Sequence, residues 1–352
     1  FDSSTVCGRS VANGNKDKRV VPAYTIKTAG PLKVGIMGFT TARALAAVGT
    51  SVTAGYQFTD GSVEYPCLIN KLRNDEKVDV VVIATTSWVK DQMADLRRII
   101  TAGINCVSIA EEMADPYAQN PELAADLDEL CLKNNVTVLG TGVNPGYVLD
   151  LLVVALTGGN HNVERIEASR VNDLSPYGPT VMKTQGVGIP PAAFKAGIED
   201  GSIVGHVGFP ESIHMISDAL GLGVDRIEQV REPIISQVYR ETPHVKVQPG
   251  MVAGCAHTGI GYRGDKEVIR LVHPQQIHPH LEGQETGDYI HIYGKPEINL
   301  AIKPEIAGGV ATMGLAVNMI PHVFAATPGL KRMIDMPAPA ALMGESAYSR
   351  HI

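Results

Sequence analysis

The amino-acid sequence predicts an α/β protein in which a doubly wound parallel sheet is followed by an α+β domain. Up to about residue 157, short apolar runs alternate with segments of helical periodicity, which is the pattern of a parallel sheet with helices on both faces. Beyond that point, strands of alternating apolar and polar residues follow one another, which favours a mostly antiparallel sheet. At 352 residues the chain is also too long for one typical core, so two domains are expected.

The changes of pattern place the expected domain boundaries. We expect an irregular N-terminal arm over residues 1–31, a Rossmann-like parallel-sheet domain over 32–157 and an α+β domain over 158–307. Residues 308–352 begin with a helical stretch and are predicted to return to the first domain. A helix that returns from the second domain would cover the sheet of the first domain and complete its hydrophobic core.

The elements expected in the first domain follow from its apolar runs and helix signals. The expected strands are 32–38, 51–58, 78–84, 104–109 and 136–140. The expected helices are 41–48, 91–102 and 121–133. Asn120 and Pro121 are suited to the N-cap and to the first turn of the last of these helices.

In the second domain, period-two alternation predicts the strands and an apolar stripe predicts a helix. The expected strands are 164–172, 234–247, 265–273, 288–294 and 298–302, and the expected helix is 209–220. These elements form the predicted mostly antiparallel sheet.

Three neighbouring strands of the first domain end in small or polar residues, where we expect a cofactor site. These residues are Thr85, Thr86, Ser87, Ala110, Glu111 and Asn144. Open parallel sheets bind ligands beyond the carboxyl ends of their strands. The sequence therefore predicts that Thr85, Ser87, Glu111 and Asn144 line one cleft together with the turn at Gly38, in a dinucleotide-binding domain. Thr86 and Ala110 are further candidates for cofactor contacts.

The turn after the first strand is the expected phosphate site, because a helix N-terminus presents free N–H groups. It departs from the G-x-G-x-x-G fingerprint, since Thr40 and Arg43 replace the second and third glycines. We assign cofactor contacts here to Gly35, Gly38, Phe39, Thr40 and Thr41. Arg43 is either a 2′-phosphate ligand or a solvent-facing helical residue, and Asp60 is either a ribose ligand or a turn residue. The choice between NAD and NADP stays open.

Candidate acids and bases follow two of the predicted elements. Glu111 and Glu112 directly follow a buried strand, and at most one of them faces the cleft. A partly desolvated carboxylate there has a raised pKa and can move a proton, but the pair can equally serve a helix start. His206 is either a proton-transfer group that titrates near neutrality or a structural histidine. Glu211 is either a substrate ligand or a partner of a helix dipole.

The densest polar segment is a loop that runs from Asn172 to Gln185. Its donors, acceptors and rigid Pro/Gly corners suit an amino-acid-like ligand, although an ordinary surface loop has a similar composition. Asp173 joins Glu111 and His206 as a catalytic candidate. The substrate-binding candidates are Asn144, Asn172, Lys183, Gln185 and Glu211.

Composition argues against several classes of protein. The net charge of −7 and the absence of a basic run disfavour a nucleic-acid partner, and no apolar stretch reaches about 18 uninterrupted residues, so no membrane span is expected. The first residues show no signal peptide. The five scattered cysteines are expected to be free thiols. The spacing of His273, His278 and His280 fits no metal-ligand pattern, so no metal is expected.

From about residue 78 to 345 the chain resembles the 2,4-diaminopentanoate dehydrogenase family, a relative of the dihydrodipicolinate-reductase-like dehydrogenases. The longest matching segments run from Gly140 to Gly146, from Val171 to Met182 and from Gly205 to Ser212. Shorter ones are Ala110–Met113, Tyr239–Pro243, His273–Gln276 and Asn318–His322.

The resemblance implies NAD(P)-dependent oxidative deamination of 2,4-diaminopentanoate to 2-amino-4-oxopentanoate and ammonia, a step of ornithine fermentation. It also implies a cytoplasmic homodimer, with 158–307 as the substrate and dimerisation domain. One alternative is a dehydrogenase or reductase of the same fold with another small amino-acid substrate. A second alternative is a non-catalytic nucleotide-sensing protein, which the broken glycine fingerprint favours.

Overall fold

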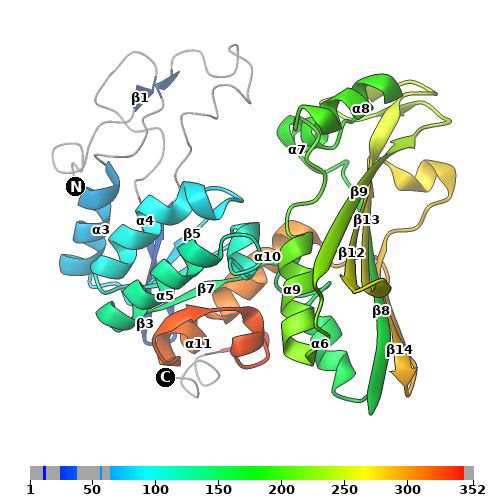
Figure 1. Cartoon of the computed structure of the whole chain (residues 1–352). Coiled ribbons are helices and arrows are strands. Elements are labelled where there is room, and N and C mark those ends of the chain that lie inside the picture. Colours follow the sequence, from blue (N-terminus) through cyan, green and yellow to red (C-terminus); the bar gives the residue numbers. More distant parts are fainter. Residues whose placement is uncertain (1–10, 13–23, 38–55, 58–63, 345–352) are drawn as a thin grey trace. The chain divides into compact units, whose positions relative to one another are not determined.

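The computed structural model describes residues 11–12, 24–37, 56–57 and 64–344 (Figure 1). The chain forms two compact units: unit 1 contains the residues up to Gly142 and those from Gly309 onward, and unit 2 is Val143–Gly308. The first boundary falls before residue 157, because helix α6 (Leu151–Thr157) packs on helix α9 (Phe209–Leu220) within unit 2. The C-terminal segment from Gly309 belongs to unit 1.

Unit 1 is built on a six-stranded sheet with the order β16-β7-β6-β5-β3-β2. Its strands are β2 (Thr25–Ala29), β3 (Leu32–Met37), β5 (Val80–Ile83), β6 (Asn105–Ser108), β7 (Thr137–Gly140) and β16 (Gly329–Lys331). Every neighbouring pair is parallel except β2–β3, which is antiparallel. The predicted doubly wound parallel sheet is confirmed.

Several details of unit 1 differ from the sequence prediction. Part of the expected irregular arm is a strand, because Thr25–Ala29 forms β2 and turns into β3 through Gly30, whose φ is +59°. The short strand β16 was not predicted, since three residues carry too little periodicity. A separate two-stranded pair joins β1 (Val11–Ala12) to β4 (Tyr56–Gln57). The expected helix 41–48 and most of strand 51–58 lie outside the described residues.

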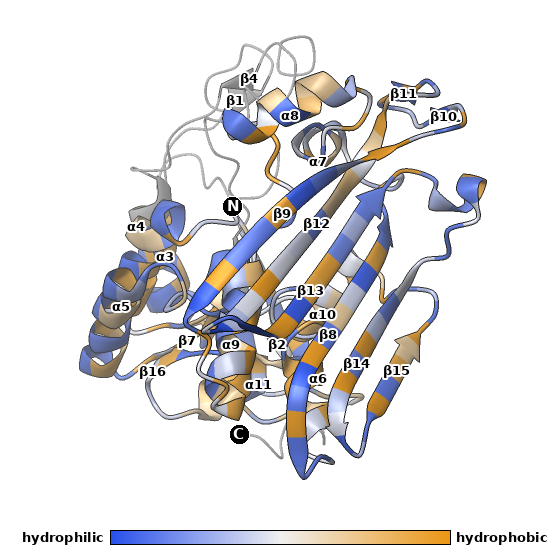
Figure 2. Ribbon diagram, turned by 45° about the vertical axis from the view of Figure 1, so that its right-hand side comes forward, coloured by the Kyte–Doolittle hydropathy of each residue, from blue (hydrophilic) through white to orange (hydrophobic). Residues whose placement is uncertain are grey.

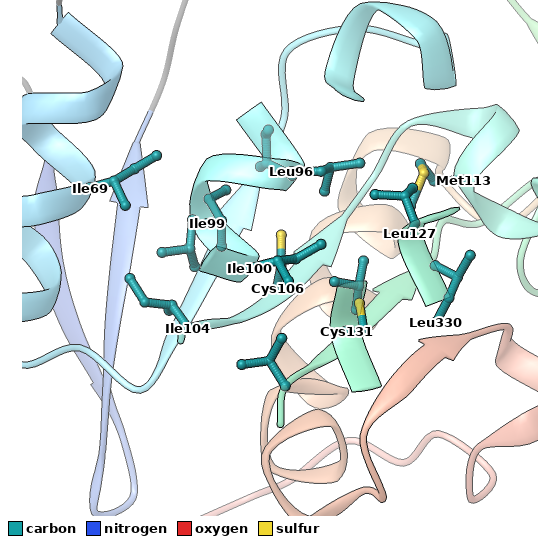
Figure 3. Close-up of a cluster of buried hydrophobic side chains, with 14 of the residues drawn as sticks. Ile69, Leu96, Ile99, Ile100, Ile104, Cys106, Met113, Leu127, Cys131 and Leu330 are labelled. Atoms are coloured by element: carbon teal, nitrogen blue, oxygen red, sulfur yellow. The ribbon is translucent and has the colours of Figure 1, made fainter. Parts of the chain in front are cut away.

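The structure describes five helices in unit 1. They are α3 (Glu64–Asn74), α4 (Val89–Thr101), α5 (Pro121–Asn134), α10 (Gly308–Asn318) and α11 (Ile320–Ala325). In α4 the residues Leu96, Ile99 and Ile100 are fully buried, at the spacing of one helix face. Figure 3 shows them packed with Cys106 of β6 and Leu127 of α5. Short 3₁₀ turns are η2 (Glu111–Ala114) and η4 (Met333–Asp335).

One stretch of unit 1, Gly308–Ala325, has the length and the mean hydropathy (1.3) of a membrane span. It consists of α10 and α11, and α11 packs against β6 and β7. Ile320, Pro321 and Val323 of α11 are buried there. Packing on the parallel sheet accounts for the apolar residues of α11. In α10, by contrast, Val310, Met313 and Val317 are exposed.

Unit 2 is built on a second six-stranded sheet with the order β15-β14-β8-β13-β12-β9. Its strands are β8 (Asn162–Asp173), β9 (Arg226–Ile235), β12 (Val252–Arg263), β13 (Lys266–Gln276), β14 (Gly287–Lys295) and β15 (Ile298–Ile302). Only the β13–β8 pair is parallel, so the predicted mostly antiparallel sheet is confirmed. Figure 2 shows apolar and polar residues alternating along β8 and β14.

Helix α9 contacts β12 and β13, and with α6 it lies on one face of this sheet (Figure 1). The other helical segments of unit 2 are α7 (Pro179–Thr184), α8 (Pro191–Glu199) and the 3₁₀ turn η3 (Pro279–Glu282). The helix predicted over 209–220 and the strand predicted over 298–302 have the predicted bounds.

Two strand predictions in unit 2 were wrong. The expected strand 234–247 is the end of β9 followed by a small hairpin of β10 (Arg240–Glu241) and β11 (Lys246–Val247). Strand β12 was missed because it contains Gly254, Gly259 and Gly261, and glycine weakens the strand signal. A Cβ added at Gly259 would lie 2.9 Å from Phe209 of α9, so the glycine lets the helix approach the sheet closely.

Cys106, Cys131 and Cys255 are free and buried, and burial raises the pKa of the Cys131 and Cys255 thiols to about 12. The expectation of free thiols is confirmed at these three positions. It is wrong at Cys67, which is disulfide-bonded. Buried thiols with raised pKa values are unreactive, so these three serve packing.

Candidate active site

The carboxyl ends of β5 and β6 bring together several of the residues predicted to bind the cofactor. The Thr85 hydroxyl accepts a hydrogen bond from Gln92 Nε2 at 3.4 Å, and Ser87 is hydrogen-bonded to Glu111. The Thr86 hydroxyl accepts from the N–H of Trp88 at 3.3 Å, at the start of α4. Thr85, Ser87 and Glu111 therefore form one polar edge of the unit 1 sheet, while Thr86 serves the helix start.

The adjacent acids Glu111 and Glu112 have different environments. A Glu112 carboxylate oxygen accepts from the Val89 N–H at 2.8 Å and from Asn120 Nδ2 at 3.4 Å, so Glu112 satisfies the first turn of α4. Burial raises the pKa of the Glu111 carboxyl and the neighbouring Glu112 charge raises it further, whereas the hydrogen bond from Ser87 opposes the shift. Glu112 therefore serves the start of α4, and Glu111 is the acid of the pair whose pKa is raised.

Asn120 occupies the N-cap position of α5, as predicted, but its side chain makes no capping hydrogen bond there. It donates to Glu112 instead. The local sequence predicts a capping bond by Asn120, but the fold places the Glu112 carboxylate beside the Asn120 amide, which donates to it instead of capping the helix.

The predicted phosphate turn cannot be placed in this site, because Gly38, Phe39, Thr40, Thr41, Arg43 and Asp60 lie outside the described residues. Gly35 is described, and it is buried inside β3. A Cβ there would lie 3.1 Å from Leu72 Cδ2 of α3. Gly35 therefore lets α3 pack closely on β3, and its contact with a cofactor stays a prediction.

The described edge of unit 1 fits a dinucleotide in one respect. The hydroxyl of Thr141, directly after β7, is buried and has no hydrogen-bond partner among the described residues. Its backbone N–H donates to the Ser108 carbonyl at 2.9 Å, which holds it beside the end of β6. A buried hydroxyl without a partner is rare and is expected to face a polar ligand group. Sequence reasoning missed Thr141, although it belongs to the Gly140–Gly146 motif.

In unit 2, three histidines from separate elements meet around Phe209. His206 precedes α9, His257 lies in β12 and His273 lies in β13. The ring centroids of His206 and His273 are 4.9 Å apart, and Phe209 lies 4.8 Å from His206 and 4.9 Å from His257. We call His206, His257, His273, Asn144 and Gln185 the histidine cluster.

Backbone and amide contacts orient this cluster. The His206 N–H donates to His257 Nδ1 at 3.0 Å, so the neutral His257 ring carries its proton on Nε2. Asn144 Nδ2 lies 3.4 Å from His273 Nδ1. Gln185 Nε2 donates to the Gly205 carbonyl at 2.7 Å. The structure thus brings three sequence-predicted residues, Asn144, Gln185 and His206, to one place.

Several polar atoms of the histidine cluster are buried without a partner within the described part of the chain. They are the Nε2 atoms of His206, His257 and His273, Oδ1 of Asn144 and Oε1 of Gln185. Buried polar atoms are normally paired, and leaving one unpaired costs about 1–3 kcal/mol. A group of such atoms around one point indicates a site for a ligand with several donors and acceptors.

Burial keeps all three imidazoles neutral. It lowers the pKa of His206 to about 3, with a further contribution from the positive charge of Arg170. It lowers the pKa of His257 to about 2 and that of His273 well below the ordinary value. The expectation that His206 titrates near neutrality is therefore wrong, because the cluster is desolvated and lies near a cation.

Asp150 fastens the turn that carries Asn144 to the start of α9. Its carboxylate accepts from the N–H of Leu151 at 2.6 Å, from the N–H of Gly146 at 2.7 Å and from Ser212 Oγ at 2.8 Å. The next residue before Ser212, Glu211, is fully buried in the first turn of α9. Sequence reasoning missed Asp150, although an acid before a helix is a common N-cap.

The polar residues of the loop 172–185 have different surroundings. Side chains of successive strand residues point to opposite faces, so Asn172 and Asp173 diverge. Asn172 donates to Glu305 Oε1 at 3.4 Å, whereas Asp173 Oδ1 accepts from Ser175 Oγ at 2.6 Å and from the His278 N–H at 3.1 Å. Lys183 is exposed at the end of α7. Asp173 and Lys183 are therefore not part of the histidine cluster.

Arg170, two residues before Asn172, is buried and paired with Asp288 at 2.6 Å. Its guanidinium also donates to the Ile306 carbonyl at 2.5 Å. Its charge lowers the pKa values of both His206 and His273, which places a buried cation within electrostatic range of the cluster. Arg170 was not among the sequence candidates.

Unit 1 is a parallel sheet with polar residues at its strand ends, and unit 2 is an α+β unit with a buried polar cluster. These two features are typical of nucleotide-dependent dehydrogenases built from two units. The chain belongs to the 2,4-diaminopentanoate dehydrogenase family. Residues 147–352 match the model of the 2,4-diaminopentanoate dehydrogenase C-terminal domain. The chain is 47% identical over 272 residues to the 2,4-diaminopentanoate dehydrogenase of Acetoanaerobium sticklandii, which covers 77% of each protein.

Two further proteins are similar to this chain. An amine dehydrogenase of Streptomyces virginiae is 26% identical over 293 residues, covering 74% of this chain and 78% of the relative. The structure of an amine dehydrogenase from Mycobacterium smegmatis superposes with a TM-score of 0.69 at 23% identity, covering 86% of this chain and 89% of that one. The latter likeness shows a shared fold. The sequence-based recognition of the family and of an oxidoreductase is confirmed.

Proposed function

We propose that this protein catalyses the NAD(P)-dependent oxidative deamination of 2,4-diaminopentanoate to 2-amino-4-oxopentanoate and ammonia. The observation that carries the proposal is the 47% identity to a relative that bears this activity in its name. The buried histidine cluster supports it, because a small ligand with two amines and a carboxylate needs several donors and acceptors in one desolvated place.

The chemistry consists of an oxidation and a hydrolysis. The C4 amine of the substrate loses a proton, C4 loses a hydride, and a C4=N imine forms. Water then adds to C4, the C–N bond breaks and ammonia leaves, so that a ketone remains. The nicotinamide of the bound NAD(P) supplies the hydride acceptor.

Glu111 is the proposed proton acceptor. A neutral C4 amine is needed before hydride can leave, and a carboxylate with a raised pKa binds that proton more strongly than an ordinary one. The same carboxylate can later activate the water that attacks the imine. Thr85, Ser87 and Thr141 are proposed to contact the cofactor at the edge of unit 1.

The histidine cluster is the proposed substrate site. Neutral imidazoles can hydrogen-bond to a dicationic chain without repelling it, and Asn144 and Gln185 add amide oxygens and nitrogens. The buried charge of Arg170 favours the substrate carboxylate on its side of the cluster. Glu211, buried at the start of α9, is proposed to compensate an ammonium group.

A second candidate is amine oxidation by the same chemistry on a different small substrate. The likeness to two amine dehydrogenases favours it. Initial rates with NAD and NADP should be measured on 2,4-diaminopentanoate, ornithine, 2-aminobutane and 2-aminopentanoate. The proposal expects kcat/KM to be highest for 2,4-diaminopentanoate, with stoichiometric ammonia and 2-amino-4-oxopentanoate by mass spectrometry. A higher value for 2-aminobutane would establish the second candidate, and cofactor binding without any turnover would indicate a nucleotide sensor.

We further infer a homodimer that works in the cytoplasm, as expected for this family. Light scattering coupled to size-exclusion chromatography measures the mass in solution, and a monomeric mass at micromolar concentration contradicts the dimer. Fractionation of expressing cells tests the compartment.

A further inference from the structure

We propose that unit 2 carries a zinc site formed by Asp173, His278 and His280, apart from the residues assigned to the reaction. Asp173 ends β8, while His278 and His280 lie at and just inside the start of η3. One ligand atom from each residue lies within 4.8 Å of the other two. The spacing of the histidines alone indicated nothing, because the carboxylate comes from a strand distant in sequence.

A hydrogen bond already orients His278 as a ligand. Its Nε2 lies 2.8 Å from the Glu241 carbonyl oxygen, and a carbonyl oxygen can only accept. The proton of the neutral ring is therefore on Nε2, and Nδ1 keeps its lone pair. Histidines that bind metals are typically held in this way, by the second ring nitrogen donating to a backbone carbonyl or a carboxylate.

Asp173 is held in a comparable way. Its Oδ1 accepts from the Ser175 N–H at 2.8 Å, from Ser175 Oγ at 2.6 Å and from the His278 N–H at 3.1 Å. These bonds fix the carboxylate against the loop that carries the histidines, and they leave Oδ2 to bind an ion. In the same loop, the backbone of His278 has a φ of +45°. Residues other than glycine rarely adopt this conformation, and such residues concentrate at binding sites.

Arg240 binds the loop that carries His278 and His280 through several hydrogen bonds. It is buried, and it donates to the Ile277 carbonyl at 2.5 Å, to Gln276 Oε1 at 2.8 Å and to Glu282. Through the bond to Gln276, Arg240 joins the segments Tyr239–Pro243 and His273–Gln276. These contacts mean that the ligands sit on a braced loop rather than on a free one.

The donor set selects the ion. Two imidazole nitrogens and one carboxylate oxygen suit Zn²⁺, which binds them at about 2.0–2.2 Å with a water in the fourth position. Mg²⁺ and Ca²⁺ prefer oxygen ligands throughout. His280 is exposed, so its ring can turn inward to close the 4.8 Å spread. Asp173 and His280 also line a hollow of about 920 Å³, which leaves room for the water ligand.

The test measures zinc binding by the full-length chain after treatment with a chelator. Isothermal titration with ZnCl₂, checked by elemental analysis after dialysis, is expected to give one zinc per chain. His280→Asn should weaken binding about ten- to a hundredfold, because one of three protein ligands is lost. His161→Asn replaces an exposed histidine before β8 and should bind as the wild type does.

Asp173→Asn provides a second variant, and far-UV circular dichroism checks that both variants fold. Co²⁺ in place of Zn²⁺ should give visible absorption in the wild type that both variants lose, and MgCl₂ should not compete. Absence of a stoichiometric zinc in the wild type, or equal zinc affinity in His280→Asn and the wild type, overturns the proposal. Dehydrogenase activity is a separate readout, so failure here leaves the proposed function untouched.

Discussion

The polar residues at the sheet edge of unit 1 and those of the histidine cluster in unit 2 are satisfied in opposite ways. At the edge, Glu112, Thr86 and Asn120 are used by helix starts or by one another, and Glu111 stands out by its raised pKa. In the cluster, five side chains keep buried atoms that have no partner among the residues the structure describes. A polar residue that is hydrogen-bonded within the fold contributes stability, whereas a group of buried polar atoms left unpaired at one place favours a ligand site there.

The largest expected effect is the loss of kcat when Glu111, but not its neighbour Glu112, is replaced. Glu111→Gln should lower kcat by roughly a hundred- to ten-thousand-fold, the range of a lost general base. Wild-type kcat/KM should rise with pH through the raised pKa of Glu111, because only the carboxylate accepts a proton. Steady-state rates across pH provide the measurement, and the exposed Glu122→Gln is the matched control. A Glu111→Gln enzyme with wild-type kcat would remove Glu111 from the site.

The stability of the same variant provides an independent check. A folded pKa above the unfolded one means that the folded chain binds the proton more tightly, so this stability is present at low pH and is lost as pH rises. Glu111→Gln should therefore be as stable as the wild type at pH 7, or more stable, in urea unfolding. Lower stability would indicate a structural role.

The buried histidines should make the protein sensitive to acid. Their folded pKa values lie below the unfolded value of 6.5, about 2 for His257, so stability falls as pH drops below 6.5. Each such histidine should lower the free energy of unfolding by roughly 2 kcal/mol when the pH falls from 7 to 5. Urea unfolding at both pH values measures this. His257→Gln is expected to reduce the dependence by the share of one histidine, and His161→Gln is expected to leave it unchanged. The same slope in both variants would mean that His257 is protonated when folded.

A steric test addresses how the turn at Asn144 is held. Gly208 has a φ of +121°, and a Cβ there would lie 2.4 Å from Pro145 Cδ. Gly208→Ala should destabilise the protein by about 2–4 kcal/mol, the sum of backbone strain and overpacking. Gly221 also has a positive φ, of +63°, but an added Cβ would meet open space. Gly221→Ala should therefore lower the free energy of unfolding by only about 1 kcal/mol. Equal thermal unfolding of the two variants would show that the turn moves freely.

The smallest expected effect concerns Glu112. Glu112→Gln keeps the shape but weakens the acceptor for the Val89 N–H, so unfolding free energy should fall by about 1 kcal/mol with kcat nearly unchanged. Chemical denaturation and steady-state rates measured together test this. A loss of kcat comparable with that of Glu111→Gln would mean that both acids take part in the reaction.

Much of the fold follows from local pattern. The helix over 209–220 and the strand over 298–302 have the bounds that periodicity predicts, because their apolar residues repeat at the spacing of one buried face. Asn144, His206 and Gln185 were recognisable as site candidates, since they stand in turns or loops rich in glycine and proline, where polar residues have no part in a core.

Long-range packing accounts for what the pattern could not give. Strand β12 was hidden because its glycines suit the close approach of α9, a contact invisible in a single segment. His257 and His273 read as ordinary strand residues until the sheet register set them beside His206. Asp173 was grouped with Asn172 by adjacency, yet the two point to opposite faces, and Asp173 meets His278 instead. Local sequence specifies periodicity and turns, whereas burial, the charges that shift a pKa and the partners of a polar atom depend on residues that only folding brings close.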